Sequence, residues 1–230
     1  MPWEREAKGT GTALGWLQDV FAFIQDNPDR FREAFVAHLR ISGAALGLAV
    51  LIYIPLGVLA SRAERFGSTA VGLISSLRVI PSLALIFLFF PWLGTGFRTA
   101  LYALVILAAP PLIINTYSGL RNVDRSALEA ASGIGMNLTQ VFFRVQLPLA
   151  LPVIIAGIRS ATVEIVASAT LASFIGVRSL GQFIVTGITL LDTTYLLVGA
   201  IPIMLLVLAA EVLLGGVERI VTPPTRSSTR

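Results

Sequence analysis

The stretch Glu129-Ala130-Ala131-Ser132-Gly133-Ile134-Gly135, which continues to Val145-Gln146-Leu147-Pro148, is a polar-to-amphipathic segment in an otherwise strongly apolar chain. Three hydrophobic segments precede it and two follow it. A membrane protein seldom keeps so long a loop, with so much helix-forming signal, for connection alone. We therefore interpret residues 129–148, called the insert below, as a docking element.

The composition is that of a membrane protein. Of 230 residues, 55% are hydrophobic and 13% charged, and the mean hydropathy is +0.82; soluble domains carry roughly 25% charged residues. The chain has no cysteine and one histidine, His38, so we expect no disulfide, no metal site and no cofactor. The net charge of +4 is spread between the apolar segments, which indicates membrane topology rather than nucleic-acid binding.

The apolar segments predict an all-α membrane bundle of about five spans. About 20 apolar residues cross a hydrocarbon core of about 30 Å. The predicted spans are Ile41–Ala60, Val71–Leu93, Thr99–Ile114, Leu151–Phe174 and Tyr195–Leu214. Pro81 and Pro110-Pro111 predict broken helices, which either line a cavity or are packing kinks.

The two ends of the chain are more polar than the spans. Residues 15–24 and 30–38 predict two short amphipathic helices at the membrane interface, separated by a break at Asn27-Pro28-Asp29. No cleaved signal is expected. The predicted parts are an interfacial segment (1–37), a transmembrane domain (38–219) and a disordered cytoplasmic tail (220–230).

Arginines predict the orientation. The loops after the second and fourth spans hold one each, Arg98 and Arg178. The segments after the first, third and fifth spans hold Arg62 and Arg65, then Arg121, Arg125 and Arg144, then Arg219, Arg226 and Arg230. The positive-inside rule therefore predicts that the segments after the first, third and fifth spans are cytoplasmic. The insert belongs to the segment after the third span.

The sequence indicates two helix N-termini in and next to the insert. Ser126 and Glu129 have the spacing of a capping box, and Asn137 and Gln140 offer a second one. Gly133, Gly135 and Asn137 predict a sharp turn between the two helices. The alternative interpretation is that Glu129 is only a cap in an ordinary loop.

The insert resembles the "EAA" loop of ABC-importer permeases: Glu-Ala-Ala, three residues, Gly, nine residues, a β-branched residue, one residue, then Leu-Pro. Other stretches are similar to the osmoprotectant branch of these permeases, which carries glycine betaine, choline and carnitine. They are His38-Leu39, Ile54-Pro55-Leu56-Gly57, Ile80-Pro81-Ser82-Leu83-Ala84, Asn115-Thr116-Tyr117-Ser118-Gly119-Leu120, Ala169-Thr170-Leu171-Ala172 and Gly199-Ala200-Ile201-Pro202. The chain departs from the family at Arg178 and Ser179, where glycines are common.

The resemblance implies the permease subunit of a type I importer in a bacterial or archaeal cytoplasmic membrane. The implied partners are two cytoplasmic ATPases, a second permease subunit, which is the same or paralogous, and an external substrate-binding protein. It also implies that the insert contacts the ATPase through Glu129, Ala130, Ala131, Gly135, Leu147 and Pro148. The chain has no phosphate-binding Gly-x-x-x-x-Gly-Lys loop, so it is expected to be a transport component and not an enzyme.

Charges inside the spans are the remaining candidates. A charge at a helix centre costs about 2.5–3.5 kcal/mol, so such residues usually face the bundle interior or a cavity. We expect Arg78, Pro81, Ser82 and Glu164 along a translocation pathway, where Glu164 would attract a quaternary ammonium. The alternative is that Glu164 and Arg78 form a buried structural pair. Arg159 and Glu211 are expected to extend toward the interface.

The sequence is compatible with other functions. The same machine carrying methionine or an aliphatic sulfonate is the nearest alternative. An ion-coupled secondary transporter would use Glu164 for its coupling ion, but no inverted repeat supports it. An intramembrane hydrolase lacks a Gly-x-Ser-x-Gly motif.

Overall fold

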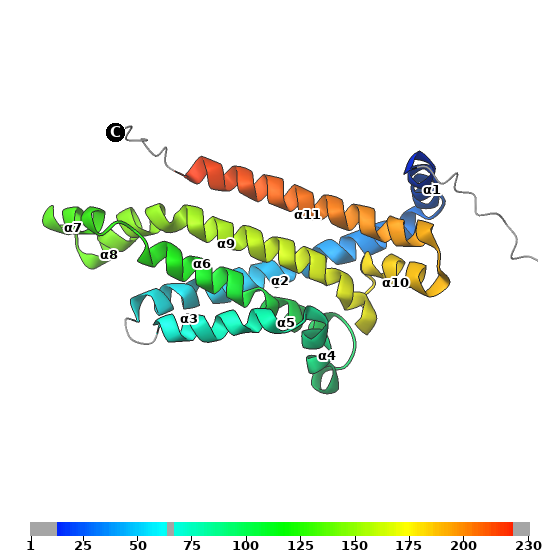
Figure 1. Cartoon of the computed structure of the whole chain (residues 1–230), viewed down its shortest axis with the longest axis horizontal. Coiled ribbons are helices and arrows are strands. Elements are labelled where there is room, and N and C mark those ends of the chain that lie inside the picture. The colour runs from blue at the N-terminus through cyan, green and yellow to red at the C-terminus, as the bar shows by residue number, and fades with distance from the viewer. Residues whose placement is uncertain (1–12, 64–66, 223–230) are drawn as a thin grey trace, which may run out of the picture.

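The computed structural model describes residues 13–63 and 67–222, and every regular element in those ranges is a helix. The elements are α1 (Ala13–Asp26), α2 (Pro28–Arg62), α3 (Gly67–Ser75), η1 (Ser76–Val79), α4 (Ser82–Leu93), α5 (Phe97–Leu107), α6 (Ala109–Arg121), α7 (Arg125–Gly133), α8 (Leu138–Val141), η2 (Phe142–Gln146), α9 (Leu147–Ser168), η3 (Ala169–Ile175), α10 (Gly181–Leu190) and α11 (Thr193–Val221). Helices α2, α6, α9 and α11 run along the long axis of the molecule (Figure 1), with α9 packed against both α6 and α11.

The predicted all-α membrane bundle is confirmed. Within the described ranges, four helical stretches are long and apolar enough to cross a membrane. A fifth span is obtained if the bent pair formed by residues 67–79 and 82–93 is counted as one. The four stretches are Pro28–Arg62, Phe97–Arg121, Leu138–Ile175 and Thr193–Val221.

Helix α2 runs across the expected N-terminal boundary. The break at Pro28 is present, because α1 ends at Asp26 and Pro28 opens α2, where the missing N–H interrupts no helical bond. The predicted short helix 30–38 is wrong as a separate element, since α2 runs on unbroken to Arg62. No glycine or proline lies between Arg30 and Ile41 to end it. The proposed boundary between residues 37 and 38 therefore falls inside a helix.

The two predicted proline breaks differ sharply. At Pro81 the chain turns by 94° between η1 and α4. Ile80 is extended (ψ 121°), as expected for a residue before proline. Pro110 and Pro111 instead lie in the first turn of α6, where their missing N–H groups break no helical bond, so α5 and α6 form one span.

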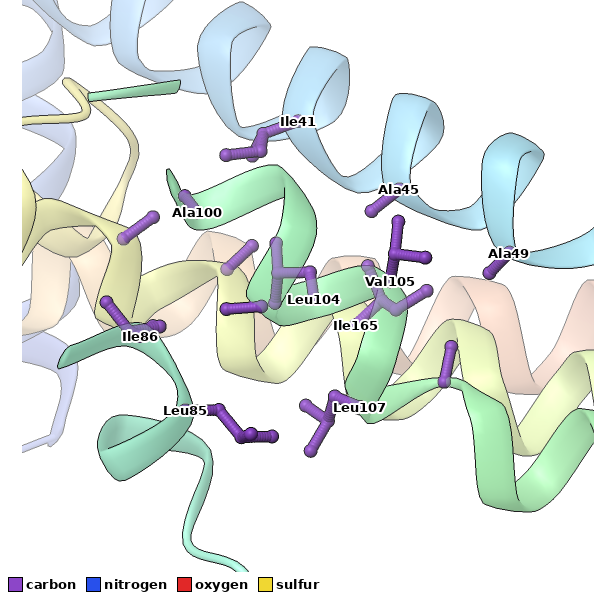
Figure 2. Close-up of a cluster of buried hydrophobic side chains, with 14 of the residues drawn as sticks. Ile41, Ala45, Ala49, Leu85, Ile86, Ala100, Leu104, Val105, Leu107 and Ile165 are labelled. Carbon is purple, nitrogen blue, oxygen red and sulfur yellow. The ribbon is translucent and has the colours of Figure 1, made fainter. Parts of the chain in front are cut away.

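The core between α2, α4, α5 and α9 combines alanines with leucine, isoleucine and valine side chains (Figure 2). Ala45 and Ala49 of α2 face Leu104 and Val105 of α5, and Ile165 of α9 lies in the same cluster. Small side chains let helix backbones approach closely, and the resulting van der Waals packing is one source of helix association in a membrane.

The molecule has two different ends. Helices α7 and α8 extend beyond α6 and α9 at the end where α11 finishes, whereas α1 and α10 lie at the opposite end (Figure 1). Arg62 ends α2, Arg121 ends α6 and Arg219 lies in the last turn of α11. The predicted tail 220–230 lies mostly outside the described residues.

Candidate functional site

The first helix of the insert starts differently from the prediction. Asp124 is the N-cap of α7: its carboxylate accepts hydrogen bonds from the Ser126 N–H (2.9 Å) and the Ser126 hydroxyl (2.9 Å). These bonds hold the pKa of the Asp124 carboxyl below its ordinary value. The predicted cap formed by Ser126 and Glu129 is wrong, because Asp124 occupies the capping position. Glu129 lies exposed on α7.

The second predicted cap is confirmed. The Asn137 side chain accepts from the Gln140 N–H at 2.9 Å, and the Gln140 side chain accepts from the Asn137 N–H at 3.0 Å. This reciprocal pair fixes the start of α8, a helix of one turn. The α8 end of the short connection between α7 and α8 is thereby held by local bonds.

The turn between α7 and α8 depends on Gly135. Its φ is +87°, a left-handed conformation that glycine adopts without steric cost. The Met136 N–H donates to the Ala131 carbonyl at 3.2 Å, which closes the end of α7. Ala131 is buried, whereas Ala130 and Gly135 are exposed. The predicted sharp turn is confirmed.

The tip of the insert exposes apolar side chains that the sequence reasoning did not single out. Ile134 is 77% exposed, Leu138 87% and Phe143 60%. Their apolar nature next to two helix caps was the available signal. Exposed apolar groups rimmed by polar ones are typical of an interaction surface.

The insert joins the bundle through a π-helical turn, η2. The Leu147 N–H donates to the carbonyl of Phe142, five residues earlier in the chain. In an α-helix it would donate to the carbonyl four residues earlier. Leu147 packs against the cluster of Leu120, Phe142, Ala150 and Ile154, and the exposed Pro148 lies in the first turn of α9.

The predicted pathway residues lie at two places. Arg78 of η1, Pro81 and Ser82 lie at the 94° break, where Arg78 and Pro81 are exposed. Glu164 lies half-buried in α9. Arg78 is near enough to act electrostatically on Glu164, but the two make no ion pair within 4.0 Å in the described part of the chain. The buried structural pair is therefore not what the structure shows.

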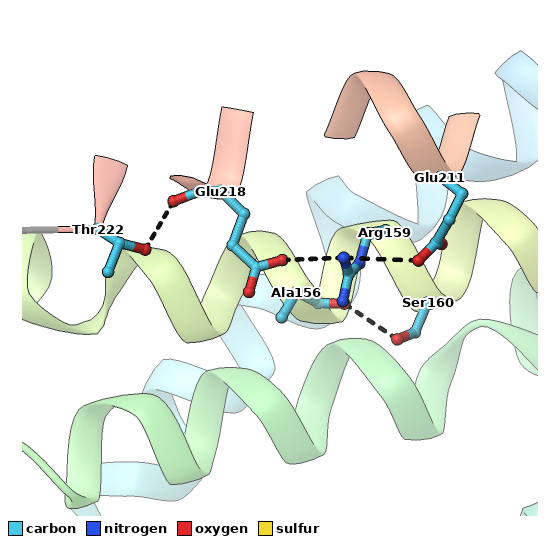
Figure 3. A network of polar contacts seen from close by, with 6 residues as sticks. All are labelled: Ala156, Arg159, Ser160, Glu211, Glu218 and Thr222. Atoms are coloured by element: carbon cyan, nitrogen blue, oxygen red, sulfur yellow. Dashed lines mark hydrogen bonds and ion pairs between the residues drawn. The ribbon is translucent and has the colours of Figure 1, made fainter. Parts of the chain in front are cut away.

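Arg159 has partners that the sequence did not reveal. Its Nη1 lies 3.5 Å from Glu211 Oε1 and 3.4 Å from Glu218 Oε2, so one α9 cation bridges two α11 carboxylates (Figure 3). The expectation that Arg159 and Glu211 extend toward the interface did not include this contact. Residues 211 and 218 are seven apart, two helical turns, and so share one face of α11.

Replacing Arg159 by glutamine should destabilise the contact between α9 and α11. Polar contacts between membrane helices are worth about 0.6 kcal/mol on average and about 1.7 kcal/mol at most, and Arg159→Gln removes two contacts while leaving two carboxylates close together. We expect a loss of about 1 kcal/mol, measured by unfolding in detergent micelles. Glu211→Gln leaves the Arg159–Glu218 contact in place, so it should lower the free energy of unfolding by less. An Arg159→Gln variant as stable as wild type would contradict the assignment.

Two further polar residues have structural partners. The fully buried His38 donates its Nε2–H to the Val166 carbonyl at 3.0 Å and so joins α2 to α9. Ser179, also fully buried, donates to the Ala169 carbonyl at 3.2 Å. Ser179 therefore fixes the loop before α10, while the neighbouring Arg178 stays exposed, 3.6 Å from Glu33.

Comparison with known proteins identifies relatives over most of the chain. Residues 53–223 match the family described as "Binding-protein-dependent transport system inner membrane component". The choline transport system permease protein OpuBB of Bacillus subtilis is 38% identical over 207 residues, 90% of this chain and 95% of that protein. The carnitine transport permease protein OpuCB of Listeria monocytogenes is also 38% identical, with the same coverage.

Solved structures support the same fold. The MetNI methionine ABC transporter, in an inward-facing conformation, aligns with a TM-score of 0.70 at 21% identity, covering 81% of this chain and 94% of that one. An amino acid ABC transporter with histidines aligns with a TM-score of 0.71 at 20% identity, covering 87% of this chain and 98% of that one. At such identities the likeness concerns the fold alone.

Proposed function

Because the chain belongs to the family of binding-protein-dependent transport system inner membrane components, we propose that it is the permease subunit of an ATP-driven importer for osmoprotectants. The proposed cargo is glycine betaine, choline, carnitine or a related quaternary amine. The observation that carries this proposal is the 36–38% identity, over 90% of the chain, to permeases named for those solutes.

The insert is proposed as the site that contacts the ATPase, through Glu129, Ala130, Ala131, Gly135, Leu147 and Pro148. Two features support this role. The tip is exposed and partly apolar, with Ile134 and Leu138 uncovered. It also extends beyond the long helices of the bundle (Figure 1), which leaves it accessible to a partner at that end of the molecule.

The proposed orientation places the insert and the end of α11 in the cytoplasm. Arg62, Arg121 and Arg219 at the ends of three long helices share that end of the molecule, and the positive-inside rule favours it as the cytoplasmic side. The proposed partners are two ATP-binding subunits on that side, a second permease subunit beside this one and an external substrate-binding protein on the opposite side. ATP hydrolysis then belongs to the partner.

Uptake measurements test the cargo. In cells that express the full system, labelled betaine, choline or carnitine should accumulate only when the ATPase subunit is present. A matched strain with the ATPase deleted is the control. Uptake that persists without the ATPase would overturn the proposal, and uptake of methionine in place of these amines would assign a different cargo.

Glu164 is proposed to line the translocation pathway. Its carboxylate is half-buried on α9, and no ion pair within 4.0 Å neutralises it among the described residues. Glu164→Gln keeps the shape and removes the charge. Uptake should fall about threefold to fivefold, as expected for losing an attraction near 1 kcal/mol. Wild-type uptake at wild-type expression would exclude the role, and Glu33→Gln, at an exposed carboxylate outside the proposed pathway, serves as the acid-to-amide control.

A further inference from the structure

The π turn that joins the insert to the bundle, called the joint below, lies where the local sequence disfavours an α-helix. Residues 138–175 form one helical stretch, and Pro148 lies in its interior. In an α-helix the Pro148 ring would clash with the Arg144 carbonyl, and no N–H would be present to bond it. The chain instead widens into the π turn Phe142–Gln146 immediately before the proline. The π turn therefore removes this clash at the Leu-Pro pair.

The π turn sets the rotation of the insert about the axis of α9. It accommodates one residue more than an α-turn, and one residue corresponds to about 100° of rotation. As a result Phe142 points into the bundle, 9% exposed among Leu120, Ala150 and Ile154, whereas Phe143 is 60% exposed. A helix without the π turn would rotate these two rings by that angle.

Two side chains fix the π turn to neighbouring spans. The Arg62 guanidinium, at the end of α2, lies over the Phe142 ring, 4.6 Å from its centroid. The Gln146 side-chain amide donates to the Leu120 carbonyl at 3.1 Å. That carbonyl belongs to the last turn of α6, where helical carbonyls lack a partner within the helix. The joint is thus tied to α2 by a cation–π contact and to α6 by a hydrogen bond.

We propose that Arg62 and Gln146 are positioning residues for energy coupling. They lock the π turn to the ends of α2 and α6, so that a displacement of the insert moves α2, α6 and α9 together. Without them the displacement is absorbed by bending at the π turn, because π turns and inserted residues are the usual places where helices bend. This inference rests on the proposed contact between the insert and the ATPase.

The experiment uses the complete importer, with permease, ATPase and binding protein, in proteoliposomes. Substrate transported per ATP hydrolysed is measured for Arg62→Gln and for Gln146→Met, which keeps the side-chain length without the donor. Each should lower this ratio roughly fivefold to tenfold, at the low end of typical coupling between sites. ATPase retention on purification should stay at the wild-type level. Arg62→Lys, which keeps a cation for the ring, should retain most of the ratio.

The controls separate coupling from folding and from net charge. Arg121→Gln removes an exposed arginine at the same end of the bundle and should leave the ratio unchanged. An unchanged ratio in both Arg62→Gln and Gln146→Met overturns the proposal. The proposal is also overturned if uptake falls in parallel with thermal stability while the substrate transported per ATP hydrolysed stays constant. Failure of the proposed contact between the insert and the ATPase is distinguishable, because the wild-type permease would then not retain the ATPase.

Discussion

Gly135→Asp is expected to lower ATP-driven uptake about fivefold or more while leaving the protein folded in the membrane. Gly135 has φ +87°, and a residue with a Cβ pays about 1–2 kcal/mol in the left-handed region, with aspartate toward the lower end because its side chain can hydrogen-bond locally. The strain favours other shapes of the turn between α7 and α8, and about 1.4 kcal/mol corresponds to a tenfold change in population. The bundle is unaffected, since nothing lies within 4 Å of a Cβ built at this position.

Gly133→Asp is the matched control for that variant. Gly133 is likewise exposed and has open space around it, but it ends α7 without a positive φ. The Gly133→Asp variant adds the same charge two residues away from Gly135 but does not place a Cβ at a positive φ. Uptake and ATPase retention would be measured for both variants at equal expression. Full uptake with Gly135→Asp would show that the turn does not serve docking, and equal loss in both would assign the effect to charge.

Gly157→Val is expected to prevent normal packing of α9 against α6. A Cβ at Gly157 would lie 2.7 Å from Asn115 Cβ and 2.9 Å from the Pro111 carbonyl oxygen. The backbone of α6 cannot rotate away as a side-chain tip would, so the helices must separate. Overpacking costs about 1–3 kcal/mol and occasionally more, and we expect the upper end of that range.

Thermal unfolding in detergent and the yield of folded protein measure the effect of Gly157→Val. Gly47→Val is the matched control, because it makes the same change within a span where nothing lies within 4 Å of the added Cβ. A Gly157→Val protein with wild-type thermal stability would contradict the close approach of α6 and α9.

Several local features were predictable from the sequence. The apolar segments gave the membrane-spanning helices, because about 20 apolar residues in a row have few other stable environments. The cap formed by Asn137 and Gln140 and the turn at Gly135 depend only on neighbouring residues, and both were predicted. The Asp124 cap was missed because two competing capping residues, Asp124 and Ser126, stand two positions apart.

The sequence by itself determined an all-α membrane bundle, the place of the insert within it and the spacing that links it to importer permeases. The tertiary structure alone decided which polar groups meet between different helices. Arg159 meets Glu211 and Glu218 on α11, and Gln146 meets Leu120 across 26 residues of chain. The reason is physical: spans, caps and turns follow from neighbours along the chain, whereas a partner on another helix depends on how the helices pack and rotate against each other.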